Sequence, residues 1–362
     1  GTVRENANAK VYGRIGYLGN LKQKNPEMRI ALCGCMMQEP HVIEKIKKSY
    51  RFVDIVFGTH NIYMLAELIW RKVSGEKRVF EILDGTDNIV EDLPSEHKYS
   101  FKAGVNIMYG CNNFCSYCIV PYLRGPEKYR DMEDVLAEVR KAADKGITEV
   151  TLLGQTVNAY KTEGGNFADL LTKVSEIGGI RRIRFTSPHP RHYTNELIDV
   201  LLNNPKVCHY AHIPIQSGSD AMLKKMRRQH NMEQYLSIIE QLRSKDPFYG
   251  ISTDVICGFV GETEEDFEQT LKAFETCQFD SAFMFIYSPR KGTESYKEAE
   301  TLTEAEKNER HTRLVELQNA ITLKRNQMML GRTEELLVEK NSVRDETELR
   351  GRTDNFKKVV FK

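Results

Sequence analysis

Cys111, Cys115 and Cys118 lie in one short segment of the chain, with the spacing C-x3-C-x2-C. Cysteine thiolates are the usual protein ligands of iron–sulfur clusters, which commonly take four of them. No fourth cysteine lies nearby in the sequence, so a four-iron cluster held here would keep one iron with an open coordination position. An open position separates catalytic metal sites from closed structural ones. The spacing therefore predicts a cluster that can bind a small molecule at its fourth iron.

Two other interpretations of the three cysteines remain open. Zinc sites of this kind usually combine two C-x2-C pairs, or one such pair with two histidines, and this chain has no second pair. The cysteines could also be unrelated to one another. The spacing fits the iron–sulfur cluster better than either alternative.

The cysteine motif resembles the signature of the radical S-adenosylmethionine (SAM) superfamily, with Tyr117 in the aromatic position before the last cysteine. The continuation from Ile119 to Gly125 is similar to the methylthiotransferases within that superfamily. Residues 112–118 are most similar to the branch that modifies N6-isopentenyladenosine in tRNA. Further matching stretches cover nearly the whole chain: Val3–Ala7, Gly34–Met36, Leu152–Gln155, His212–Ser219, Gly258–Thr263 and Tyr287–Arg290.

The resemblance implies a radical mechanism. SAM would bind the open iron through its amino and carboxylate groups, and one electron would cleave it to methionine and a 5′-deoxyadenosyl radical. That radical would abstract the hydrogen at carbon 2 of the adenine next to the anticodon. Sulfur would come from an auxiliary 4Fe-4S cluster, and a second SAM would methylate it. The protein would supply orientation and exclude side reactions.

The auxiliary cluster of this family is held by three cysteines of the N-terminal domain, and only Cys35 matches one of them. Gly1 occupies the second position and the third lies before the given chain, so we expect the start of the domain to be missing. Cys33, Cys208, Cys257 and Cys277 are interpreted instead as small buried apolar residues.

Three other functions are kept as alternatives. Two belong to the same family: methylthiolation of threonylcarbamoyladenosine in tRNA, and of an aspartate side chain in a ribosomal protein. The third is of a different class, a non-catalytic iron–sulfur module that binds RNA. Reductive cleavage of SAM separates the enzymes from the binding module.

Polar residues follow the predicted strands at their carboxyl ends, where active-site groups of parallel β/α barrels gather. They are interpreted as SAM-binding residues: Gln155, Asn158, Thr186, Ser187, Gln216, Ser217 and Asp254, with Tyr117 beside the SAM adenine. A helix cap at Gln155 and a buried amide partner at Asp254 are the structural alternatives. Candidate substrate contacts are Phe114, Tyr122, Arg124 and Arg290.

The order of predicted elements gives an α/β protein with three domains. Residues 1–93 form an N-terminal methylthiotransferase domain, with a helix at 3–24, strands at 29–33 and 54–57, and helical segments near 41–48 and 62–73; an acidic linker follows at 91–96. Residues 94–330 alternate six strands with helices, which predicts a parallel sheet and an open, partial barrel, and the resemblance implies a (β/α)6 radical SAM barrel. One of these helices begins with the capping pattern Thr263-Glu264-Glu265-Asp266. Residues 331–362 contain predicted strands at 335–339 and 357–361 and resemble the start of a TRAM domain, a small β-barrel, although a β appendage that caps the barrel is the alternative.

Lysine and arginine number 52 against 51 aspartate and glutamate, so any RNA contact must come from local basic patches. Three segments are candidates: residues 124–130, 181–184 and 224–228, for which a solvated surface is the alternative.

We find no membrane span or signal peptide in the sequence, and eight cysteines without secretory features favour a reducing cytoplasm. The expected partners are a tRNA anticodon stem-loop and a reductant protein such as flavodoxin or ferredoxin, and we expect a monomer.

Overall fold

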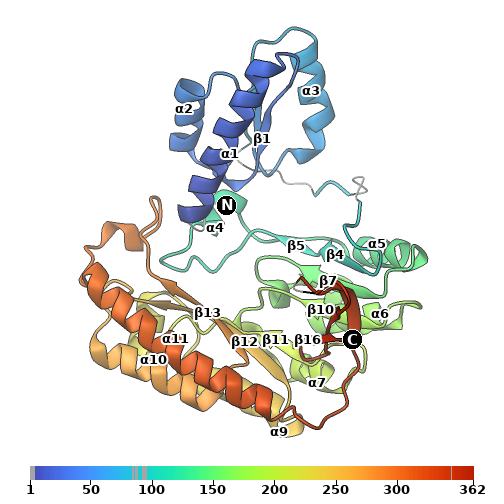
Figure 1. The fold of residues 1–362 in the computed structure, drawn as a ribbon, viewed down its shortest axis with the longest axis vertical. Coiled ribbons are helices and arrows are strands. Elements are labelled where there is room, and N and C mark those ends of the chain that lie inside the picture. The colour runs from blue at the N-terminus through green and yellow to red at the C-terminus, as the bar shows by residue number, and fades with distance from the viewer. Residues whose placement is uncertain (1–4, 84, 86–88, 92–95, 344) are drawn as a thin grey trace. The chain divides into compact units, whose positions relative to one another are not determined.

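The computed structural model describes residues 5–83, 85, 89–91, 96–343 and 345–362 (Figure 1). Contacts divide the chain into two compact units. The first unit comprises residues 1–95, 109–114 and 118–128, and the second comprises residues 96–108, 115–117 and 129–362. Residues 331–362 belong to the second unit, so a separate third domain stays a prediction. The predicted linker lies partly outside the described residues.

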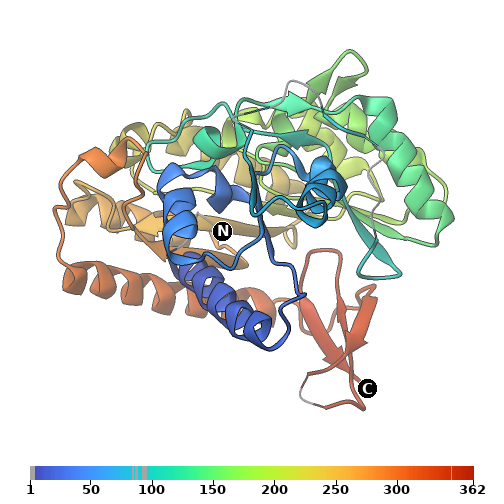
Figure 2. The ribbon, with the colours of Figure 1, turned by 90° about the horizontal axis from the view of Figure 1, so that it is seen from above.

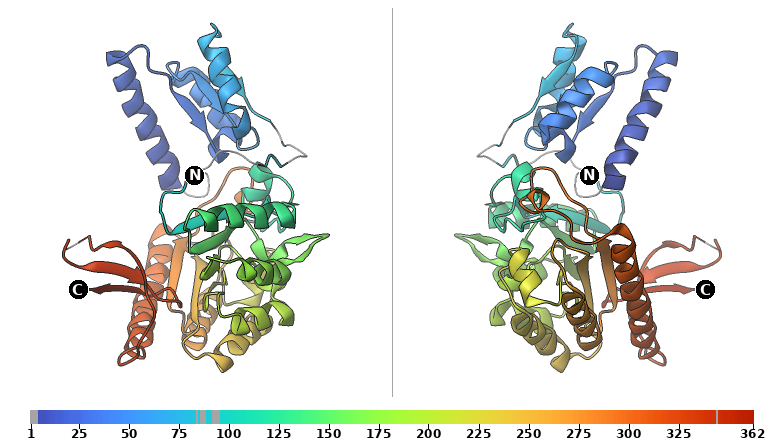
Figure 3. Two further views of the ribbon diagram at one scale, coloured as in Figure 1. Left: turned by 90° about the vertical axis from the view of Figure 1, so that its right-hand side faces the viewer. Right: turned by 90° about the vertical axis from the view of Figure 1, so that its left-hand side faces the viewer.

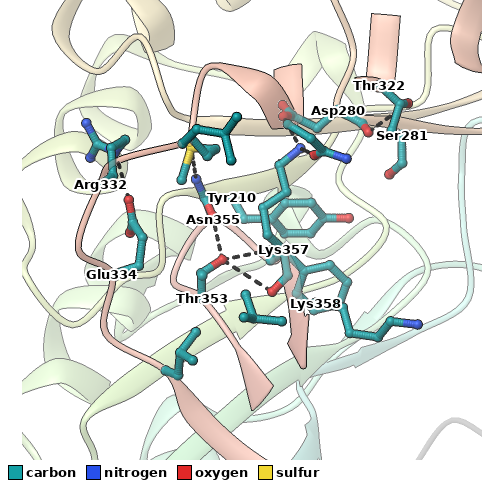
Figure 4. Close-up of a pocket in the computed structure, with 16 residues that line it drawn as sticks. Tyr210, Asp280, Ser281, Thr322, Arg332, Glu334, Thr353, Asn355, Lys357 and Lys358 are labelled. Atoms are coloured by element: carbon teal, nitrogen blue, oxygen red, sulfur yellow. Dashed lines mark hydrogen bonds and ion pairs between the residues drawn. The ribbon is translucent and has the colours of Figure 1, made fainter. Parts of the chain in front are cut away.

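The first unit is a small α/β layer structure. Its three-stranded parallel sheet has the order β1 (Ala31–Cys33), β2 (Ile55–Phe57) and β3 (Val79–Glu81). The helices α1 (Glu5–Lys24), α2 (Pro40–Ser49) and α3 (Leu65–Val73) surround it (Figure 3), with short 3-10 helices at Cys35–Gln38 and Ile62–Met64. Helix α4 (Val120–Arg124) also belongs to this unit. Apolar residues of α1 and α2 pack on the sheet, as the sequence predicts.

The second unit contains six parallel strands in chain order. They form the sheets β10 (Arg182–Phe185)–β7 (Glu149–Leu153)–β4 (Lys102–Asn106) and β11 (Tyr210–His212)–β12 (Gly250–Cys257)–β13 (Ser281–Ile286). A parallel bridge between Ile183 and Val207 connects the two halves. This arrangement confirms the predicted partial barrel.

Helices alternate with these strands and cover their outer side (Figure 1). They are α5 (Met132–Asp144), α6 (Phe167–Glu176), α7 (Asn195–Asn203), α8 (Asp220–Lys225), α9 (Met232–Lys245), α10 (Glu264–Cys277) and α11 (Glu304–Gln327). The short strands are β5 (Met108–Tyr109), β6 (Lys128–Tyr129), β8 (Lys161–Thr162) and β9 (Gly165–Asn166), and further 3-10 helices lie at Val157–Ala159, Pro190–His192 and Ser295–Lys297.

The start of α10 shows how local sequence sets these helices. The Thr263 hydroxyl accepts the Asp266 N–H at 3.2 Å, and the Asp266 carboxylate accepts the Thr263 N–H at 3.0 Å. This reciprocal capping box is the predicted one, and such a cap stabilises a helix by about 1 kcal/mol. Helices α6, α9 and α11 also begin with a capping box.

The C-terminal strands form an antiparallel sheet in the order β14 (Leu337–Asn341), β15 (Leu349–Arg352) and β16 (Lys358–Phe361) (Figure 2). The sequence predicts β14 and β16 but misses β15. Its sequence, Leu-Arg-Gly-Arg, contains neither β-branched nor aromatic residues and includes a glycine, so its β-propensity is low.

The prediction that residues 181–184 neutralise phosphates is wrong for Arg182 and Arg184, because both are buried. Arg182 donates to the carbonyl oxygens of Arg352 and Glu335 at 2.9 and 3.0 Å. Arg184 donates to the carbonyl oxygens of Asp354 and Thr353 at 3.0 and 2.9 Å. These arginines therefore hold the C-terminal segment against the barrel strand β10.

Candidate metal centre

The cysteine segment begins directly after β5, at the end of the first barrel strand. Gly110 has φ 78°, and a Cβ atom there would lie 2.0 Å from the Pro126 carbonyl oxygen, so only glycine fits. The Cys111 N–H donates to the Gly125 carbonyl at 3.2 Å, and the Ser116 N–H donates to the Met226 carbonyl at 3.0 Å. These backbone contacts fix both halves of the segment.

Two of the candidate sulfur ligands accept N–H groups from the protein. Asn113 Nδ2 donates to Cys111 Sγ at 3.3 Å, and a guanidinium nitrogen of Arg228 donates to Cys115 Sγ at 3.6 Å. Cys111 and Cys115 are buried, whereas Cys118 is half-buried. Hydrogen bonds to sulfur are how proteins tune and support iron–sulfur clusters, so the donor set fits such a cluster.

Within the described ranges, no three His, Cys, Asp or Glu side chains are gathered so that they could hold a single metal ion. Cys111, Cys115 and Cys118 are therefore a proposed ligand set, supported by the chemistry of their neighbours.

Cys35 begins the 3-10 helix after β1 and is half-buried. Arg124 Nε donates to its sulfur at 3.1 Å. Helix α4, which carries Arg124, directly follows the cysteine segment in the chain. The structure thus brings together the one predicted auxiliary-cluster ligand and a residue that the sequence assigned to substrate binding.

Phe114 and Tyr122 are exposed at 45% and 48%, and their rings meet edge to face at 5.8 Å. Exposed aromatic rings of this kind can stack on unpaired RNA bases. Tyr117 differs, because it packs edge to face on Phe259 at 6.3 Å beside a buried apolar cluster.

Three predicted site residues have strained backbones. Phe114, Ser187 and Gln216 have φ of 46°, 58° and 67°, a left-handed region that non-glycine residues seldom adopt. Ser187 and Gln216 follow β10 and β11, at their carboxyl ends. Strain of this kind concentrates at functional sites. Beyond β7, a side-chain oxygen of Gln155 is buried and has no hydrogen-bond partner in the described parts of the chain.

Other predicted SAM-binding side chains are engaged inside the protein. Asn158 Nδ2 donates to the His189 carbonyl at 2.9 Å, and Asn158 Oδ1 accepts the His189 N–H at 2.8 Å. Ser217 is fully buried and accepts the N–H of Ser219 at 3.2 Å. Asp254 Oδ2 lies 3.2 Å from His212 Nε2. Thr186 and Arg290 are half-buried. Contact of these residues with SAM or substrate stays a prediction.

The two remaining basic segments are mixed. Arg130 is buried and donates to the Asn106 carbonyl at 2.7 Å, and Arg228 is buried too, so the phosphate-binding prediction is wrong for both. Lys224 and Arg227 are exposed, and phosphate binding by these two residues stays a prediction.

Cys208, Cys257 and Cys277 are buried, as predicted, and burial raises the pKa of the Cys257 and Cys277 thiols to about 12. The prediction of a buried Cys33 is wrong. Its strand, β1, lies at the edge of the sheet, and the residue is exposed.

Sequence reasoning missed Arg228, His189 and His230 as possible site residues. Arg228 ends a run of basic residues that resembles a solvated surface, so nothing in the sequence indicated its burial. His189 lies two positions after the predicted site residue Ser187, and this proximity could have indicated it. Burial and Arg228 lower the pKa of His230 to about 3, and burial together with Arg228 and His230 lowers that of His189. Both imidazoles are therefore neutral.

No helix among the described residues is long and apolar enough to cross a membrane.

A family model described as the radical SAM superfamily matches residues 105–274, and one described as the uncharacterized protein family UPF0004 matches residues 1–58. Curated proteins named tRNA-2-methylthio-N(6)-dimethylallyladenosine synthase are similar over almost all of this chain. The one from Lachnoclostridium phytofermentans is 53% identical over 100% of this chain and 80% of its own length. The one from Clostridioides difficile is 46% identical over 99% of this chain and 76% of its own length.

Among solved structures, the radical S-adenosylmethionine methyltransferase TsrM from Kitasatospora setae matches 53% of this chain and 38% of that chain, with a TM-score of 0.46 and 16% sequence identity. This likeness is too weak to support an argument.

Proposed function

This chain belongs to the family of tRNA-2-methylthio-N(6)-dimethylallyladenosine synthases, and we propose that it catalyses the reaction in that name. It converts N6-isopentenyl (dimethylallyl) adenosine next to the anticodon of tRNA to its 2-methylthio derivative. It is a radical SAM enzyme, whose cofactors are a 4Fe-4S cluster and SAM. One structural observation carries the proposal: a cysteine triad at the end of the first barrel strand, with N–H donors directed at its sulfurs.

Cys111, Cys115 and Cys118 would hold the cluster. When bound, the cluster supplies the electron that cleaves SAM into methionine and a 5′-deoxyadenosyl radical. Asn113 and Arg228 hydrogen-bond to the sulfurs of Cys111 and Cys115 and so offset part of their negative charge. The residues at the carboxyl ends of β7, β10, β11 and β12 would orient SAM, and the unpartnered oxygen of Gln155 supports a ligand there.

The anticodon stem-loop of tRNA is the substrate that fits the exposed groups. Single-stranded loop bases are commonly splayed out and stacked on aromatic side chains, a role that suits Phe114 and Tyr122. The exposed cations Lys224 and Arg227 would contact the phosphate backbone. Phosphate contacts of this kind make RNA binding depend on salt.

Cys35 would be one of three ligands of the auxiliary cluster that donates sulfur. The hydrogen bond from Arg124 to its sulfur resembles the donors at the first cluster and supports this role. We further propose a cytoplasmic monomer that receives electrons from a flavodoxin or ferredoxin.

Cys111→Ala, Cys115→Ala and Cys118→Ala test the cluster directly, with Cys33→Ala as the matched control because Cys33 is exposed and outside the ligand set. After anaerobic reconstitution, each of the three variants should lose 5′-deoxyadenosine formation from SAM, while the control keeps it. Undiminished 5′-deoxyadenosine formation in any of the three would contradict the assignment.

Mass spectrometry of tRNA nucleosides tests the substrate. Cells that lack this protein should lose 2-methylthio-N6-isopentenyladenosine and accumulate its precursor without the methylthio group. Loss of the threonylcarbamoyl counterpart instead would favour the related tRNA activity, and unchanged tRNA nucleosides would favour the ribosomal-protein or binding-module alternatives.

A further inference from the structure

Two buried histidines lie near each other, one on the loop that follows β10 and the other on the connection between α8 and α9. His189 precedes the 3-10 helix at Pro190–His192, and His230 lies just before α9. They are only 5% and 8% exposed, and their rings meet edge to face with centroids 5.7 Å apart. Two imidazoles that are 41 residues apart in the sequence thus contact each other in the structure.

Three of the four ring nitrogens in this pair have no hydrogen-bond partner among the residues that the structure describes. They are Nε2 of His189 and both nitrogens of His230. The fourth, Nδ1 of His189, accepts the N–H of Arg191 at 3.2 Å. Buried polar groups in folded proteins are almost always hydrogen-bonded, so three unpartnered nitrogens at one place point to a bound molecule.

Hydrogen bonds position one histidine of the pair, and Arg228 lies between the pair and a proposed cluster ligand. Asn158 donates to the His189 carbonyl and accepts the His189 N–H, so its side chain positions the backbone of His189. Arg228 donates to the Pro214 carbonyl at 3.0 Å and to the Cys115 sulfur, and its charge acts on both histidines. Arg228 therefore connects the histidine pair to a proposed cluster ligand. A preformed, rigid set of hydrogen-bonding groups is what a binding site requires.

The charge state of the histidines selects the type of ligand. Burial disfavours protonation of His189, and so do the nearby cations Arg228 and Arg191 and the neighbouring imidazoles of His230 and His192. A neutral imidazole offers one N–H donor and one lone-pair acceptor. Two such rings suit a neutral group with both donors and acceptors, such as a purine edge or ribose hydroxyls, better than a phosphate.

We propose that His189 and His230 bind an adenosine moiety, by hydrogen bonds from their unpartnered ring nitrogens to its base edge or ribose hydroxyls. The inference rests on the proposed function, which supplies two sources of adenosine: SAM and the modified nucleoside of tRNA. The same side-chain chemistry serves either source, so the experiment separates them.

The test uses variants that remove the unpartnered nitrogens. His230→Phe keeps a ring of similar size, and His189→Asn keeps an acceptor for the Arg191 N–H while it deletes Nε2. His192→Ala is the control, because His192 ends the 3-10 helix that follows His189 and is half-buried. Since both ring nitrogens of His230 bond to no described residue and phenylalanine keeps a ring in the same place, His230→Phe should keep the thermal midpoint of the wild-type protein without cofactors.

The readouts are SAM affinity of the reconstituted protein by equilibrium dialysis, and KM for an anticodon stem-loop that carries N6-isopentenyladenosine. Loss of one or two neutral hydrogen bonds should weaken one of these by about tenfold. Weaker SAM binding assigns the site to the SAM adenosine, and a raised KM with unchanged SAM binding assigns it to the tRNA nucleoside; both outcomes support the proposal.

The proposal is overturned if both variants match the wild type within about twofold in both readouts, or if His230→Phe lowers the thermal midpoint of the cofactor-free protein, as a purely structural role predicts. These outcomes differ from failure of the proposed function itself. In that case the wild type and His192→Ala would also fail to cleave SAM, whereas here they cleave it normally.

Discussion

Replacing Arg184 by leucine should loosen the C-terminal sheet from the barrel and destabilise the whole second unit. Arg184 forms a buried ion pair with Glu149 at 3.1 Å, and the two side chains are only 6% and 5% exposed. It also donates to the carbonyl oxygens of Asp354 and Thr353 and lies 5.0 Å from the Phe356 ring. One substitution thus removes the partners of a buried carboxylate and of two carbonyl groups.

The expected loss of unfolding free energy follows from the buried carboxylate of Glu149, which loses its partner. Removing one member of a buried ion pair commonly costs about 3–5 kcal/mol, because the other charge stays buried without compensation. We expect a loss of this size in urea-induced unfolding, together with faster proteolytic cleavage of residues 331–362. Arg184→Leu combined with Glu149→Leu should recover part of the loss, since no uncompensated carboxylate remains.

Arg181→Leu is the matched control, because Arg181 lies in the same segment but is exposed. It should change the unfolding free energy by less than about 0.5 kcal/mol. Wild-type stability of Arg184→Leu, combined with a lower affinity for tRNA and a shallower salt dependence, would refute the structural role and restore the phosphate-binding interpretation.

Three further predictions concern the loop, the substrate surface and pH. Gly110→Ala should fold but reconstitute less iron per chain, because its Cβ would lie 2.0 Å from the Pro126 carbonyl oxygen; wild-type iron content would contradict this. Phe114→Ala should raise KM for the anticodon stem-loop, since one base stack contributes about 1–3 kcal/mol; an unchanged KM would count against stacking. The hydrogen bond to Asp246, 2.8 Å long, raises the pKa of His209. Its stabilisation is therefore complete below the unfolded-state pKa of about 6.5 and is lost as the pH rises through the folded-state value. His209→Ala should flatten the dependence of urea-unfolding stability on pH as the pH rises above about 6.5, and an unaltered pH profile would exclude this linkage.

Local patterns predicted most of the fold. The six barrel strands and the capping box at Thr263 were readable because apolar runs and cap residues act over a few positions. Strand β15 was missed, since its pairing with β14 and β16, rather than its own propensity, makes it a strand. Cys33 was misjudged because the position of a strand within its sheet decides whether its side chains are exposed.

The basic segments show most clearly that local sequence does not reveal which side chains are buried by tertiary packing. Arg181, Arg182 and Arg184 look alike in sequence, yet the first is exposed and the other two are buried. The partners of Arg182 and Arg184 lie up to 170 residues away in the chain, so no local pattern could reveal them.

The sequence by itself determined the chemistry, because three closely spaced cysteines lie in one loop wherever the rest of the chain goes. Tertiary structure alone decided which side chains accompany them. Only folding brings Arg228 to the sulfur of Cys115, 113 residues away, and sets His189 against His230. Covalent spacing fixes neighbours within a loop, whereas contacts across the barrel depend on how its strands and helices pack.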